Sequence, residues 1–240
     1  MLWYKSWLET RIRFFVMLGV IALTAWYVSP EVMGRLLARS KPASAFAQSG
    51  QVALNSLWLV WAPIAVLLGG AGINTQTLRG VTHGPHGSML FTLSLPVRRR
   101  RLLDIRVALG ALETAFVIFF TCLFTWSVSP LLRAHVGVST VLVYALISLV
   151  GSSVFYCLSS FLATFLDESW QFNGAFISVG VMMFLPLPIK KFFSWDFSRM
   201  LGNPTHLKAS DLPWPGILIC LALSAAFLFA AVQVVERKQY

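Results

Sequence analysis

The chain has 240 residues, of which 57% are hydrophobic and 12% are charged, and its mean hydropathy is +0.73. This charged share is about half that of a soluble domain, which excludes a disordered chain and a water-soluble monomer. The formal net charge is +10, but membrane insertion itself selects basic residues beside apolar runs, so we expect no nucleic acid as a partner. Several apolar runs near or above the ~18 residues of a membrane span predict a polytopic membrane protein.

The N-terminal stretch resembles a signal peptide, with basic residues before an apolar run, but no small-residue cleavage site follows it. Within residues 1–13, apolar side chains share one helical face and polar side chains share the other. The apolar face carries Trp3, Tyr4, Trp7, Leu8 and Ile12, and the polar face carries Lys5, Ser6, Glu9, Thr10 and Arg13. We therefore expect an amphipathic helix that lies in the membrane interface before the chain turns into the bilayer.

Hydropathy predicts an all-α polytopic membrane protein with six transmembrane helices in a single domain of residues 1–240. The predicted spans lie near 14–30, 52–73, 107–130, 136–166, 171–189 and 214–235. Six spans put both termini on one side of the membrane, together with the loop of residues 74–106. Arginines of that loop crowd against the third span, where the positive-inside effect is strongest, so we assign this side to the cytoplasm.

Few ionisable residues lie inside the predicted spans. Glu113 is an acidic residue within an apolar run, and a carboxylate there needs a partner or water. We expect it to pair with Arg106 or Arg11 at the cytoplasmic boundary, and the alternative is that it lines a central pathway. Asn55 offers a further intramembrane polar group in the second span.

Small residues form surfaces on the second and fourth spans. They are Gly69, Gly70, Ala71 and Gly72 in the second span, and Ser148, Gly151, Ser152, Ser153, Ser159 and Ser160 in the fourth. Both groups favour close helix packing over substrate contact. The cysteines Cys122, Cys157 and Cys220 lie in apolar runs without metal-ligand spacing, so we expect core residues and neither a disulfide framework nor a metal site.

The loop of residues 74–106 is long for a connection between spans and is not simply polar. Glycine and proline breakers precede the run SMLFTLSL, and Pro96 ends it, so the pattern predicts a short helix over 88–95. The apolar side of this helix suits either the groove of a partner protein or the surface of its own membrane. The four arginines that follow favour contact with membrane lipids.

Two further loops have open interpretations. The acidic turn at 167–170 suits the cap of a fifth helix, and the alternative is a second contact with a partner. The outer segment 190–213 has aromatic residues amid charges and an Asn-Pro break. It suits either a re-entrant lid or a solvated loop with aromatic membrane anchors.

At the loop before the third span the sequence resembles a known family. The stretch GSMLFTLSLPVRRRRLLDIRVALG resembles the segment between the second and third spans of type 2 ABC transporter permeases, the transmembrane subunits of many ATP-driven exporters. The Trp-rich amphipathic start, the short basic C-terminal end and the count of six spans are also similar to that family. The resemblance implies a multi-pass protein of the bacterial cytoplasmic (inner) membrane with both termini in the cytoplasm.

The resemblance also implies partners and contact residues. The loop would form a coupling helix that docks in a groove of a separate ATPase subunit through His86, Ser88, Met89, Leu90, Phe91, Leu93, Leu95 and Pro96. Contact with the membrane surface or with the same ATPase is implied for Glu9, Arg13, Arg98, Arg99, Arg100 and Arg101. Two permease chains, a homodimer in preference to a heterodimer, would form the path with two ATPase subunits, which would bind ATP and Mg, and this chain would hold no cofactor.

The sequence has no G-x-x-x-x-G-K-[ST] P-loop, no H-E-x-x-H and no G-x-S-x-G, so we expect no catalytic site. Transport then needs a separate motor or ion coupling. The first hypothesis is the permease subunit of an ABC exporter. The alternatives are an ion-coupled secondary carrier or channel, which usually shows internal repeats and buried ionisable groups, and a non-transporting scaffold subunit of a membrane complex.

Overall fold

Helices account for most of the chain that the structure describes. This computed structural model describes residues 2–27, 64–69, 99–164, 166, 173–174, 176–177 and 214–237. The helices are α1 (Leu2–Tyr27), α6 (Arg99–Val128), α7 (Pro130–His135), α8 (Val138–Leu162) and α12 (Trp214–Arg237). Residues 64–69 are also helical, and no strand occurs within these described ranges. The all-helical class predicted from hydropathy is thus confirmed for this part of the chain.

A short connection that contains α7 joins α6 to α8. Pro130 begins the short helix α7, because its fixed backbone angle and missing N–H suit the first helical position. Gly137 precedes α8 with an extended backbone, at φ −69° and ψ 151°. The indole N–H of Trp126 donates to the carbonyl oxygen of Val136 over 3.0 Å, which ties the end of α6 to the start of α8.

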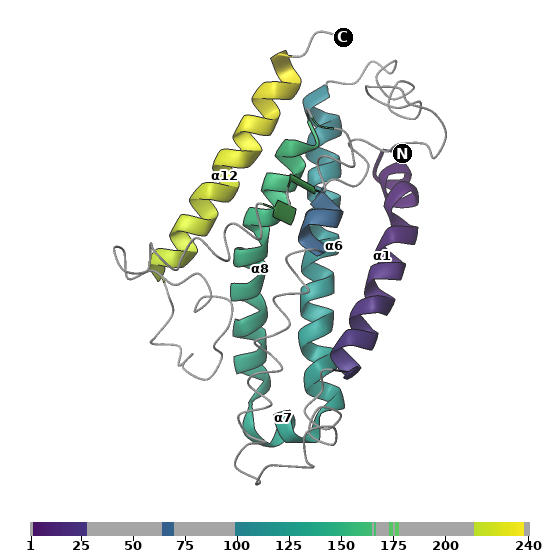
Figure 1. Cartoon of the computed structure of the whole chain (residues 1–240), viewed down its shortest axis with the longest axis vertical. Helices are drawn as coiled ribbons and strands as arrows, with labels where there is room; N and C mark the ends of the chain where they lie inside the picture. Colours follow the sequence, from purple (N-terminus) through teal and green to yellow (C-terminus); the bar gives the residue numbers. More distant parts are fainter. Residues whose placement is uncertain are drawn as a thin grey trace.

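The long helices stand side by side in the order α12, α8, α6 and α1 (Figure 1). α8 packs against both α12 and α6, and α1 packs against α6. The start of α1, the start of α6 and the ends of α8 and α12 lie toward one end of the molecule, whereas α7 lies at the other (Figure 1). The first end therefore brings together several segments that are far apart in the sequence.

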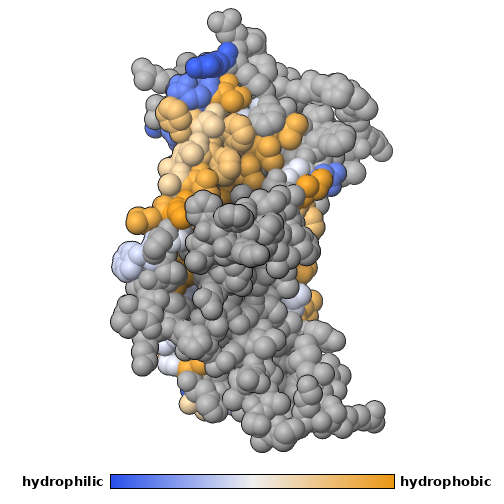
Figure 2. Space-filling model, turned by 60° about the vertical axis from the view of Figure 1, so that its left-hand side comes forward, coloured by the Kyte–Doolittle hydropathy of each residue, from blue (hydrophilic) through white to orange (hydrophobic). Residues whose placement is uncertain are grey.

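Three of the described helices are long and apolar enough to cross a membrane, over Leu103–Val128, Val138–Leu162 and Gly216–Arg237. In the most apolar stretch of the α8 span 67% of the residues are buried, against 17% for α12, so α8 is central and α12 is peripheral. Figure 2 shows a hydrophobic surface below a hydrophilic cap at one end of the molecule. Exposed apolar side chains suit lipid better than water, which together with the three apolar helices indicates a membrane protein.

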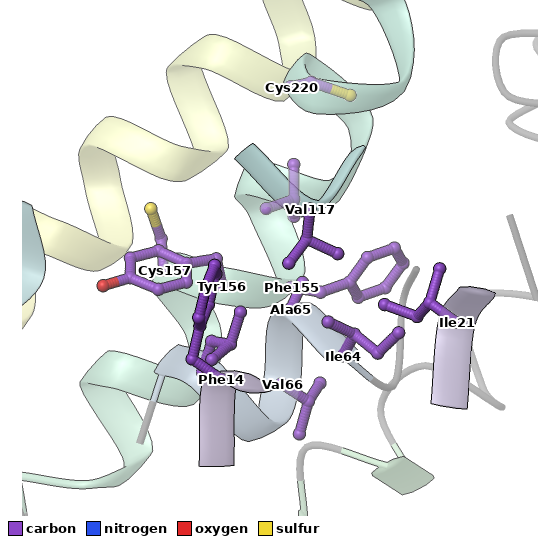
Figure 3. Close-up of a cluster of buried hydrophobic side chains, with 12 residues drawn as sticks. Phe14, Ile21, Ile64, Ala65, Val66, Val117, Phe155, Tyr156, Cys157 and Cys220 are labelled. Atoms are coloured by element: carbon purple, nitrogen blue, oxygen red, sulfur yellow. The ribbon is translucent and has the colours of Figure 1, made fainter. Parts of the chain in front are cut away.

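The main core lies where the four long helices meet residues 64–69. Its buried side chains are Phe14, Ile21, Ile64, Ala65, Val66, Leu68, Val117, Val154, Phe155, Tyr156, Cys157 and Cys220. Figure 3 shows these side chains converging from separate helices. Because lipid is as apolar as the core, close packing rather than the hydrophobic effect must hold the helices together.

The structure corrects the prediction of a separate interfacial helix at residues 1–13. α1 is one continuous helix over Leu2–Tyr27, with no turn between Arg13 and Phe14. The reason lies in the sequence, because no proline occurs in this range and its first glycine is Gly19, so nothing interrupts the helical hydrogen bonds where the polar face ends.

Two of the other predicted spans match helices closely, one starts later than its helix, and two lie largely outside the described residues. The predicted spans 136–166 and 214–235 correspond to α8 and α12 within a few residues. α6 begins at Arg99, well before the predicted 107, because a helix does not have to start where its apolar stretch starts. The predictions at 52–73 and 171–189 lie largely outside the described residues, which include helical positions at 64–69, 173–174 and 176–177.

Candidate functional site

Glu113 is the most unusual side chain in the described core. It lies on α6, ten residues or about 15 Å from Leu103, where the apolar span begins. The residue is 4% exposed. An ionised carboxylate near the centre of a membrane helix costs about 2.5–3.5 kcal/mol on insertion scales. The groups around this side chain therefore determine whether it can be charged.

A hydroxyl of α1 contacts this carboxyl group. Thr10 Oγ1 donates to Glu113 Oε1 over 2.6 Å, and Thr10 is itself buried. The second carboxyl oxygen, Oε2, is buried and has no hydrogen-bond partner among the residues that the structure describes. One bond from Thr10 thus leaves half of the carboxyl group unsatisfied.

The expected ion pair with Arg106 or Arg11 is therefore replaced by a neutral partner. Arg106 is seven residues, or about 10 Å along the axis, from Glu113 on the same helix, which separates the two groups by two turns. Arg11 is exposed, because it follows Thr10 in α1 and a helix turns by about 100° per residue. The side chain that faces α6 is consequently that of Thr10.

A close junction of α6 and α8 lies beside Glu113. The hydroxyl of Tyr156, on α8, donates to the carbonyl oxygen of Val107 on α6 over 2.8 Å. A Cβ atom added at Gly110 would lie 2.5 Å from this hydroxyl oxygen, so the glycine is required for the approach. The contacts of Thr10 with Glu113 and of Tyr156 with Val107 thus make this region a meeting point of α1, α6 and α8.

Other polar residues of α6 do not extend the site. The hydroxyl groups of Thr114, Thr121 and Thr125 donate to the carbonyl oxygens of Gly110, Val117 and Thr121, four residues earlier. This local bonding satisfies buried hydroxyls within their own helix. These threonines therefore do not mark a polar pathway.

The small residues of α8 make helix contacts, as predicted. Ser159 Oγ donates to the carbonyl oxygen of Val66 over 2.6 Å, and Ser160 Oγ donates to that of Gly69 over 2.9 Å. Ser153 Oγ is hydrogen-bonded to Ser224 Oγ of α12 at 2.9 Å. The hydroxyls thus join α8 to its neighbours, and the packing interpretation is confirmed for these serines.

No metal centre emerges from the described residues. The three cysteines are buried and free, as expected for small core side chains. Within residues 2–27, 64–69, 99–164 and 214–237, no group of three or more His, Cys, Asp and Glu residues is placed to hold a metal ion.

Most of the predicted partner contacts fall outside the described residues. These are the coupling residues His86, Ser88, Met89, Leu90, Phe91, Leu93, Leu95 and Pro96, and the membrane-surface or ATPase contact Arg98. The predicted intramembrane polar residue Asn55 also lies outside the described residues. Arg99, Arg100 and Arg101 form the first turn of α6, where Arg101 is exposed, and Glu9 and Arg13 lie on α1.

Sequence reasoning missed Thr10 and Tyr156 as site residues. The sequence places Thr10 on the polar face of residues 1–13, which indicates that its side chain avoids lipid but does not identify Glu113 as its partner. Apolar residues of the opposite face are exposed, among them Tyr4 at 68% and Ile12 at 69%. In a bilayer the apolar face suits lipid, so the polar Thr10 turns inward to α6.

No protein-family model, curated protein or solved structure matches this chain. Its function is therefore inferred from its own residues. Those residues give a helical membrane protein with three membrane-capable helices and a buried carboxyl group at the contact of α1 with α6.

Proposed function

We propose that this chain is the transmembrane permease subunit of an ATP-driven ABC exporter. In this proposal it has six spans, lies in a bacterial inner membrane with both termini in the cytoplasm, and forms the path with a second copy of itself. Its sequence contains no P-loop, so ATP and Mg belong to a separate ATPase subunit. The three long apolar helices support the membrane part of the proposal.

One observation carries the proposal. The stretch that resembles a coupling segment leads directly into α6, and the start of α6 lies toward the same end of the molecule as the start of α1 and the end of α12 (Figure 1). An ATPase at that end would meet the coupling segment together with the ends of α1 and α12. The arginines of the first turn of α6 suit the same end, because basic residues concentrate on the cytoplasmic side.

The length of α6 supports a mechanical role. Its 30 residues form one helix from Arg99 to Val128, about 45 Å long. When two ATPase subunits close on ATP, they would draw the coupling segments together, and a continuous helix would carry this displacement into the membrane. Packing of α6 against both α1 and α8 would then pass it to the remaining helices.

Co-purification tests this proposal. Tagged protein is isolated from its own host in nanodiscs, and the bound proteins are identified by mass spectrometry, with and without deletion of residues 88–95. We expect a P-loop ATPase that co-purifies with the full chain and is lost on deletion. The matched control is E113Q, which leaves the coupling segment intact and should retain the ATPase. Absence of any P-loop protein from the full-length preparation would contradict the proposal.

An ion-coupled carrier or channel is the second candidate, and one observation favours it. Glu113 holds a buried oxygen without a hydrogen-bond partner in the described part of the chain, and an intramembrane carboxyl group is a typical carrier of coupled protons. The test is proton-dependent flux in liposomes that contain this chain without an ATPase. Flux that E113A abolishes supports this candidate, whereas absence of flux leaves the exporter as the better account.

A further inference from the structure

The contact between α1 and α6 depends on an unusual pair of groups. Thr10 and Glu113 are 6% and 4% exposed, and the hydroxyl-to-carboxyl distance is 2.6 Å. The other carboxyl oxygen is enclosed without a partner among the described residues. A buried group of this kind should either be neutral or bind something.

The shape of the site limits what Glu113 Oε2 can bind. This atom has almost no accessible surface. A hydrated cation or an amine needs room and several oxygen ligands, whereas a proton needs neither. A protonated carboxyl group also carries no charge, which greatly reduces the cost of placing it in an apolar core.

Among the side chains that the structure describes on α1 and α8, none donates a hydrogen bond to Glu113 Oε2. On α1 the ionisable residues near Thr10 are Glu9, Arg11 and Arg13, of which Arg11 is exposed. On α8 the neighbouring group is Tyr156, a neutral hydroxyl that donates to Val107.

The same holds for residues 64–69, α12 and α6 within the described part of the chain. Residues 64–69 contain no titratable side chain, and on α12 the charged residues lie in the last turn, at Glu236 and Arg237. On α6 itself Arg106 and Asp104 are two or more turns away. The hydrogen bond that the carboxyl group accepts thus comes from the neutral hydroxyl of Thr10.

We propose that Glu113 and Thr10 form a proton-dependent clasp, in which a protonated Glu113 carboxyl group holds α1 against α6. Loss of the proton leaves an anion with one hydrogen bond in an apolar setting. The anion is satisfied only if α1 moves away and admits water. The docked arrangement of α1 therefore binds more protons than the separated one, so docking weakens as pH rises.

The clasp requires neither an ATPase nor transport activity. It concerns the state of one carboxyl group and the position of one helix. It holds equally for a permease, a carrier or a scaffold subunit.

Infrared spectroscopy tests the protonation. In wild-type protein in nanodiscs at neutral pH, we expect the C=O stretching band of a neutral carboxylic acid, which E113Q removes and the matched variant E236Q keeps. An ionised Glu113 at neutral pH, with no such band in the wild type, would overturn the proposal. If E113Q does not fold, the band is titrated with pH in the wild type and in E236Q. A band that is the same in both proteins does not come from Glu236 and supports a protonated Glu113.

Distance measurement tests the helix motion. Spin labels are placed at the exposed positions Ile12 on α1 and Leu112 on α6, in a background whose three cysteines are alanine. We expect the distance to lengthen by several ångströms as pH is raised in the wild type, and to stay short in E113Q, whose amide mimics the protonated acid. T10V should lengthen it already at neutral pH, whereas the control T24V, which loses a bond within α1 only, should not. A distance in the wild type that does not respond to pH would also overturn the proposal.

Discussion

Tyr156 illustrates how single residues determine the approach of the helices. Its hydroxyl reaches from α8 to the carbonyl oxygen of Val107 on α6, and this contact is possible because Gly110 has no side chain. Gly69 permits a second approach, in which the backbone of residues 64–69 meets the backbone of α8. Small residues that allow such contacts are the main means of packing helices in a membrane.

The first prediction concerns Gly110. A Cβ atom there would lie 2.5 Å from the Tyr156 hydroxyl oxygen and 3.3 Å from the carbonyl oxygen of Leu68, so G110A should lower stability by about 1–3 kcal/mol, as overpacking does. Y156F removes that hydroxyl and one hydrogen bond, at about 1 kcal/mol. Because the clash is largely with the removed oxygen, the double variant should be less destabilised than the sum of the two. Thermal unfolding of the four proteins in detergent measures this, and strict additivity would contradict the predicted contact.

The second prediction contrasts two glycines. G69A places a Cβ atom 2.6 Å from the backbone oxygen of Tyr156, which cannot move without shifting α8, so we expect a large loss of stability that Y156F does not relieve. G19A is the control, because no atom lies within 4 Å of its added Cβ and alanine favours a helix by about 1 kcal/mol over glycine. Equal decreases of the unfolding temperature in G69A and G19A would contradict the close backbone contact at Gly69.

At the scale of the element, α8 organises the described core. Its serines donate to carbonyl oxygens of residues 64–69 and to Ser224 of α12. Side chains of residues 64–69 in turn belong to the same buried cluster as side chains of the four long helices (Figure 3). The position of this short segment therefore depends on hydrogen bonds from α8 as well as on apolar contacts.

The third prediction tests that dependence. Replacing both Ser159 and Ser160 by alanine removes two bonds to Val66 and Gly69, each worth about 1 kcal/mol. Hydrogen exchange of the backbone at 64–69 should become faster by about tenfold or more, while exchange in α12 changes little. S127A is the control, because that hydroxyl is exposed and donates within α6 only. Unchanged exchange at 64–69 in the double variant would mean that the serines do not hold the segment.

Hydropathy predicted α8 and α12 well, because long apolar runs between breakers have few alternatives in a membrane. It did not predict the continuity of α1, because residues 3–13 alone have the pattern of an interfacial helix. The helix continues past this stretch because no proline or glycine lies at 13–14. The contact of Thr10 with Glu113 joins residues 103 positions apart. Nothing local in either sequence segment identifies such a partner, so the site residue Glu113 was predictable whereas Thr10 was not.

The molecule as a whole has two different ends. The start of α1, the start of α6 and the end of α12 lie toward one end, and α7 lies at the opposite end (Figure 1). The proposed exporter function assigns the first end to the cytoplasm and to an ATPase. A probe placed at each end therefore separates this account from its alternatives.

Photo-crosslinking in the native membrane tests directly whether an ATPase binds the coupling segment. A photoreactive amino acid replaces Leu90 in the coupling segment or, as the control, Val138, which is exposed near α7. We predict that irradiation joins Leu90 to a protein that contains a P-loop, as identified by mass spectrometry, and that Val138 gives no such product. Products at Leu90 that contain no P-loop protein would contradict the proposal that this chain is driven by an ATPase.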